Sequence, residues 1–122
     1  MTSYDEAKVE LVALVEETSA LVGGEWTVEE FEGEGWCNYA EGVDGKNFAA
    51  WRSAPPSDDP KAVADQVHAE WEARGFEVTT RLTPDPDMYE VIVRAPGGFH
   101  ANFTAGVGSM ILSGESVCVK AE

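Results

Sequence analysis

The chain begins with an apolar stripe that repeats at helical spacing. Leu11, Val15 and Val22 share one side of a helical wheel, and glutamates occupy the opposite side. A capping-box pattern precedes this stripe, and a Gly-Gly pair follows it. The pattern therefore predicts a core-facing amphipathic helix over residues 3–22.

The next segment reads as three short strands. Phe31 falls out of phase with the apolar positions before it, so the first strand is expected to contain a bulge near Glu29-Glu30. Val43-Asp44-Gly45 is expected to form the turn of the following hairpin. The predicted strands cover residues 25–32, 35–41 and 47–53.

A second helix is predicted after a proline-rich connector over residues 54–59. Asp59 is expected to be its N-cap and Pro60 its first helical residue. Val63, Val67 and Trp71 then form one apolar stripe, which ends at a glycine. The helix is expected over residues 60–74.

Alternating apolar and polar residues predict the remaining strands, and the clearest alternation runs over residues 76–82. A turn is expected at residues 83–87 and another at Pro96-Gly97-Gly98. The last strand is expected to be interrupted at Ser113-Gly114-Glu115. The later strands are predicted over residues 88–95, 99–105 and 110–120.

This order of elements predicts a single α+β domain over residues 1–122, with two helices packed on one face of a meandering antiparallel sheet. The two halves also suggest a duplicated unit of one helix and three strands. The expected core consists of Leu11, Val15, Val63, Val67, Trp71, Phe76, Val78, Val91 and Phe103.

Charge is unevenly distributed along the chain. The formal net charge is −15, and the first 44 residues contain twelve acidic side chains and one basic one, Lys8. Such a surface disfavours nucleic acids and anionic membranes and favours a basic protein partner. The chain has neither a membrane-inserting apolar run nor a signal peptide, so as written it is expected in the cytoplasm. If a leader has been removed, the expected location is extracytoplasmic.

The two cysteines, Cys37 and Cys118, are expected on neighbouring strands with their Cα atoms within about 7 Å of each other. In an oxidising compartment they would form a disulfide worth about 4 kcal/mol in the chain-entropy model. In the cytosol they would remain two buried thiols. The sequence leaves both alternatives open.

No catalytic, metal or cofactor motif is evident. His68 and His100 stand alone rather than at ligand spacing, and Gly106-Val107-Gly108-Ser109 lacks the lysine and the helix of a phosphate loop. The carboxylates of residues 29–34 are expected at exposed positions, whereas a glycosidase needs two in unlike environments. The sequence therefore predicts a non-enzymatic protein without a cofactor.

Aromatic residues beside the acidic segment have the composition of an interface hot spot. Trp36 and Tyr39 fall on opposite faces of one strand, so one of them should be exposed. The expected partner-binding residues are Glu6, Glu10, Glu17, Glu29, Glu30, Glu32, Glu34, Trp36 and Tyr39.

Four short motifs are Gly23-Gly24-Glu25-Trp26, Trp36-Cys37, the helix exit from Trp71 to Gly75-Phe76, and Ser116-Val117-Cys118. Together they resemble small actinobacterial lipoproteins of unknown function. This resemblance implies an extracytoplasmic domain that binds a small ligand or a component of the cell envelope. In size and charge the chain also resembles small acidic bacterial immunity proteins, which implies an inhibitor of a basic toxin.

Overall fold

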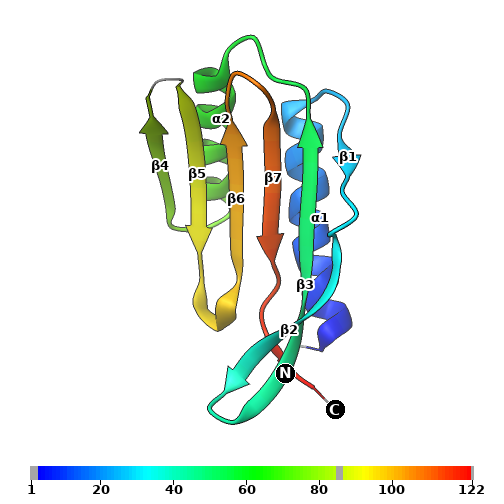
Figure 1. The fold of residues 1–122 in the computed structure, drawn as a ribbon. Coiled ribbons are helices and arrows are strands. Elements are labelled where there is room, and N and C mark those ends of the chain that lie inside the picture. The colour runs from blue at the N-terminus through cyan, green and yellow to red at the C-terminus, as the bar shows by residue number, and fades with distance from the viewer. Residues whose placement is uncertain (1–2, 85–86, 122) are drawn as a thin grey trace.

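The computed structural model describes residues 3–84 and 87–121, which form one antiparallel sheet with two helices on one of its faces (Figure 1). The eight-stranded sheet runs in the order β1-β3-β7-β6-β5-β4, and β2 and β8 also pair with β3. This confirms the α+β arrangement. The elements are α1 (Tyr4–Val22), β1 (Thr27–Val28), β2 (Gly33–Ala40), β3 (Val43–Ala54), α2 (Pro60–Ala73), β4 (Val78–Thr83), β5 (Met88–Arg94), the short 3₁₀ helix η1 (Pro96–Gly98), β6 (His100–Ala105), β7 (Met110–Glu115) and β8 (Val119–Lys120).

Both helices begin at the expected caps. The hydroxyl of Ser3 accepts a hydrogen bond from the backbone N–H of Glu6 at 3.1 Å, and the Glu6 carboxylate accepts one from Ser3 N–H at 3.3 Å. The side chain of Asp59 accepts from Ala62 N–H at 3.1 Å, and Pro60 occupies the first turn of α2. These side chains satisfy N–H groups that a helix start leaves without partners.

The core lies between the helices and the sheet. Trp71, Phe103, Leu112 and Leu11 are among its largest fully buried side chains. Six predicted core residues are buried, and Val63, Phe76 and Val78 are partly buried against them. Burial of side chains of this size contributes roughly 1.5–3 kcal/mol each.

The expected first strand is wrong in both length and shape. β1 contains only Thr27–Val28, and the chain then turns at Glu30 and Phe31 instead of forming a bulge. The backbone N–H of Glu32 donates to Glu29 C=O at 3.0 Å, which closes this turn. The chain then re-enters the sheet as β2, which pairs with an earlier part of β3.

The expected hairpin turn at Val43-Asp44-Gly45 is also wrong, because these residues begin β3. The turn lies at Glu41-Gly42 instead, where Gly42 adopts a φ of 73°. Gly45 is required for a different reason. A Cβ there would lie 2.5 Å from Cys118 Sγ and 2.8 Å from Val119 C=O.

The predicted interruption at Ser113-Gly114-Glu115 is wrong, since β7 continues through these residues. A Cβ on Gly114 would lie 2.5 Å from the carbonyl oxygen of His100, so close strand packing explains this glycine. The chain leaves the sheet at Ser116, whose hydroxyl accepts from Phe48 N–H at 2.8 Å.

The two halves contribute unequal parts of the sheet within the described residues. Three strands follow α1 and five follow α2, in place of the suggested unit of one helix and three strands. Within the expected turn over residues 83–87, residues 85 and 86 lie outside those that the structure describes.

Candidate protein-binding surface

β2 and the first half of β3 form a hairpin that extends beyond the other strands (Figure 1). A disulfide joins Cys37 in this hairpin to Cys118 just before β8, with Cα atoms 6.0 Å apart. This confirms the expected distance. The strands concerned are not neighbours, however, because β2 and β8 both pair with β3. Cys37 lies opposite Gly45, whose missing side chain leaves room for the bridge.

Trp36 and Tyr39 are both exposed on this hairpin. Trp36 retains 77% and Tyr39 48% of its accessible surface, although only one exposed ring was expected. The strand register shifts between Asn38 and Ala40, which disturbs simple alternation at Tyr39. The projecting hairpin therefore presents two large aromatic side chains to solvent.

Most of the expected acidic surface is exposed, but several of its carboxylates already have partners. Glu17 pairs with Arg74 at 2.6 Å, and Glu34 pairs with Lys46 at 3.2 Å. Glu29, which is partly buried, accepts a hydrogen bond from Ser53 at 3.0 Å. Carboxylates that are exposed and make no ion pair among the described residues include Glu10 and Glu30.

Glu32 does not belong to the exposed surface on which the sequence placed it. Its carboxylate accepts from Nε and Nη2 of Arg52, both at 3.1 Å, and from Trp51 N–H at 3.1 Å. The Glu32 and Arg52 side chains are only 10% and 11% exposed. This bidentate pair fixes the turn between β1 and β2 onto β3, so Glu32 has a structural role.

A groove of about 870 Å³ lies beside the hairpin, between the start of α1 and the C-terminal segment. Lys46 Nζ lies 4.9 Å from the centre of the Tyr4 ring on one wall, and Tyr39 also lines the groove. Burial, and then the charge of Glu34, raise the pKa of Tyr4. Sequence analysis missed this groove because its residues come from three distant segments.

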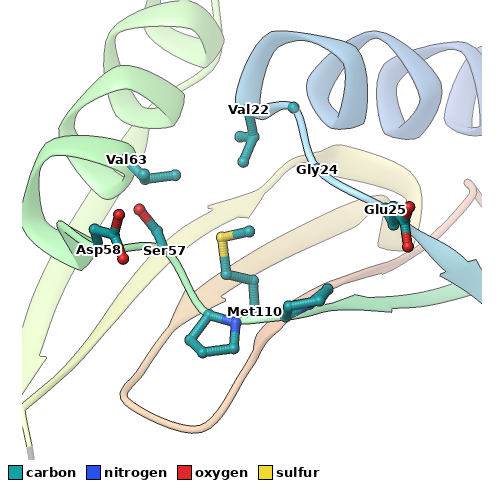
Figure 2. Close-up of a pocket in the computed structure, with 10 residues that line it drawn as sticks. Val22, Gly24, Glu25, Ser57, Asp58, Val63 and Met110 are labelled. Carbon is teal, nitrogen blue, oxygen red and sulfur yellow. The ribbon is translucent and has the colours of Figure 1, made fainter.

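A smaller pocket of about 330 Å³ lies between the end of α1 and the start of α2. Val22, Val63 and Met110 converge on it from the two helices and β7 (Figure 2). Glu25 and Asp58 lie at its rim. The end of α1 and the start of α2, which contribute residues to this pocket, lie at the end of the molecule opposite the tip of the hairpin (Figure 1).

The two histidines make contacts expected of surface or hydrogen-bonding residues. His68 Nδ1 lies 2.6 Å from the hydroxyl of Thr80, and His100 Nε2 lies 3.6 Å from Glu115.

Neither helix in the described part of the chain is long and apolar enough to cross a membrane.

Comparison with known proteins identifies the fold and leaves the function open. No protein-family model matches the chain, and no curated protein matches it. Among solved structures, a DUF4853 family protein from Actinomyces odontolyticus is similar, with a TM-score of 0.68 and 15% sequence identity. The match covers 100% of this chain and 71% of that one. At this identity the similarity shows a shared fold alone.

Proposed function

We propose that this chain is a non-enzymatic protein-binding module that uses its disulfide-bonded hairpin and acidic surface to bind a basic partner. The observation that carries the proposal is the 77% exposure of Trp36 on a hairpin held by the Cys37–Cys118 bridge. Exposed tryptophan and tyrosine are the residue types most often found at interface hot spots.

The disulfide favours binding by restricting the hairpin before the partner arrives. A recognition element that is already ordered loses less conformational entropy on binding. The net charge of −15 adds long-range attraction toward a basic surface, which mainly increases the association rate. The aromatic residues would then supply contact energy, and the acidic residues would supply steering.

The same disulfide supports a location outside the cytoplasm. Disulfides persist in oxidising compartments and are rare in the cytosol, where thiols are kept reduced. The 81-residue separation of Cys37 and Cys118 makes the bond a restraint on most of the chain. The extracytoplasmic alternative is therefore preferred to the cytoplasmic one.

The most specific form of this proposal is an immunity-type inhibitor that covers a basic toxin. Small size and a strongly acidic surface support it, because a cationic toxin surface would be electrostatically complementary.

The 870 Å³ groove supports a second candidate, a lipoprotein-like domain that binds a small ligand or an envelope component. Native mass spectrometry of the protein purified from its host tests this candidate. If the candidate is right, a small molecule is bound to the wild-type protein and to the surface variant Lys61→Ala, and it is lost from Lys46→Ala. A protein that carries no such mass would exclude the candidate.

Photo-crosslinking in the native host tests the main proposal. A benzoylphenylalanine at position 36 should form adducts with a basic protein. The same residue at position 107 is the matched control, since Val107 is 66% exposed in the loop between β6 and β7. Equal adducts at both positions, or none at position 36, would contradict the proposal.

A further inference from the structure

Strand β4 (Val78–Thr83) forms one edge of the sheet, and within the described residues it pairs with β5 alone (Figure 1). This pairing continues without a register shift from Val78 to Thr83. The outer side of β4 therefore presents backbone N–H and C=O groups with which a further strand could pair.

β4 lacks the features that usually protect a sheet edge. Its sequence, Val-Thr-Thr-Arg-Leu-Thr, is rich in β-branched residues and contains neither proline nor lysine. Its one charged residue, Arg81, donates from Nε to Glu90 on β5 at 2.7 Å, so this charge is held over the sheet. At the other edge, β1 has only two residues and β2 has a register shift between Asn38 and Ala40. Of these two edges, the β4 edge is the regular one.

The side chains of β4 suit a second strand of the same sequence. Val78 packs against the core, and Thr80 Oγ1 lies 2.6 Å from His68 Nδ1 on α2, so both residues face the helices. Leu82 follows them on the same face by alternation and remains 48% exposed. An apolar residue on an added strand would cover Leu82.

Two copies of β4 match best about a two-fold axis that passes through Thr80 perpendicular to the sheet. This axis pairs the strands antiparallel and keeps the helices of both copies on one side. Val78 then faces the partner's Leu82, and Thr79 faces the partner's Arg81. An axis at Arg81 would place two like charges opposite each other, which is unfavourable. An axis at Thr79 would move Leu82 beyond the end of the partner's β4.

The distribution of charge permits this contact. Residues 1–44 carry a net charge of −11, from twelve acidic side chains and one basic one, so the rest of the chain carries −4 of the total of −15. The acidic part includes α1, β1 and β2, whereas β4 lies at the far end of the strand order. With strands about 4.8 Å apart, pairing of two β4 edges would leave the acidic ends roughly 40–50 Å apart. That distance is several times the screening length of about 10 Å at 0.1 M salt.

We infer that the β4 edge pairs with the β4 edge of a second copy of this chain, so that the two sheets continue as one. A strand of another protein could use the same backbone groups, but the matched register and the separation of the acidic ends favour a second copy. The hairpin of β2 and β3 lies at the opposite edge and stays free in each copy (Figure 1). The dimer therefore presents two hairpins to basic partners.

Sedimentation equilibrium of the purified protein tests for this dimer. At about 200 μM chain the mass should approach twice 13.2 kDa, which corresponds to a dissociation constant of about 20 μM or tighter. Leu82→Lys should raise the dissociation constant by at least about tenfold, because its ammonium group would lie against the partner's Val78. Val107→Lys is the matched control, since it makes the same change of charge on an exposed residue of the loop between β6 and β7 and should leave the mass unchanged.

Disulfide cross-linking tests the register. Thr80→Cys should form a covalent dimer on oxidation, because the axis brings the two Cα atoms at position 80 within about 5.5 Å of each other. Thr79→Cys is the control, because the two Cα atoms at position 79 would lie about 8 Å apart, beyond the reach of a disulfide.

Three results would overturn the inference. They are a single-chain mass at about 200 μM, a dimer that is as stable in Leu82→Lys as in Val107→Lys, and equal cross-linking at positions 79 and 80. None of them bears on the proposed role of the hairpin, because photo-crosslinking from position 36 requires no dimer.

Discussion

Trp71 on α2 donates its indole N–H to the hydroxyl of Thr18 on α1 at 3.0 Å, and both side chains are fully buried. The Thr18 hydroxyl in turn donates to the carbonyl oxygen of Leu14 at 2.7 Å. This chain of hydrogen bonds joins the two helices inside an otherwise apolar layer. It satisfies a tryptophan N–H that would be costly to bury alone.

Replacing Thr18 with valine should therefore destabilise the fold by about 1–3 kcal/mol. Valine keeps the size and shape of the side chain but leaves the Trp71 N–H without its partner. Urea denaturation of Thr18→Val and Thr18→Ser measures the effect, and serine should retain most of the stability. Equal stability of Thr18→Val and wild type would show that the hydrogen bond makes no net contribution to the free energy of unfolding.

Removal of the disulfide should lower stability without changing the fold. The bond closes a loop with a sequence separation of 81, so the chain-entropy model gives about 4 kcal/mol. Guanidinium denaturation of the double variant Cys37→Ser/Cys118→Ser, compared with oxidised wild type, measures this difference. An unchanged denaturation midpoint would contradict the prediction that the disulfide stabilises the fold by restricting the denatured chain.

Glu32 and Glu30 should behave differently although they are two residues apart. Glu32→Gln breaks the charge-assisted pair with Arg52 and should reduce the free energy of unfolding by about 2 kcal/mol. Glu30→Gln changes an exposed side chain and should stay within about 0.5 kcal/mol of wild type. Thermal and urea denaturation of both variants provide the comparison. If the two variants are equally stable, the largely buried ion pair of Glu32 and Arg52 does not stabilise the fold.

Tyr4 should make stability depend on pH under alkaline conditions. Burial, followed by the charge of Glu34, raises the pKa of Tyr4 above its usual value of about 10. The neutral phenol thus stabilises the fold fully below about pH 10, and this contribution is lost as the pH rises through the folded-state pKa. Urea denaturation at about pH 8 and about pH 11 should show a larger decline for wild type than for Tyr4→Phe. An equal loss of stability in wild type and Tyr4→Phe between these pH values would contradict the assigned role of Tyr4.

The sequence predicted the elements that depend on local patterns. Both helices were located because caps and apolar stripes coincide at Ser3 and at Asp59-Pro60. The bounds of β3 and β7 were predicted less well, since a glycine in each strand has a role that involves a distant segment. Gly45 makes room for the Cys118 sulfur, and Gly114 allows a close approach of the His100 backbone. Such contacts leave no periodic signal in a single sequence.

The binding surface could be predicted only in part. The sequence predicted that one of Trp36 and Tyr39 is exposed, because they fall on opposite faces of one strand, and the structure exposes both. It could not distinguish Glu32 from its exposed neighbours, because the partner, Arg52, is twenty residues away. The Phe31–Trp51 pair was also missed, since these two rings meet only when the turn after β1 lies against β3.

The association rate of the crosslinked partner with a charge-reversed protein tests the central claim most directly. The variant is Glu10→Lys/Glu30→Lys/Glu34→Lys, which leaves the Glu32–Arg52 pair intact. Association should slow by about tenfold at low salt. The difference should shrink as the screening length falls from about 10 Å at 0.1 M to about 3 Å at 1 M salt. A folded variant that associates as fast as wild type at low ionic strength would contradict the account.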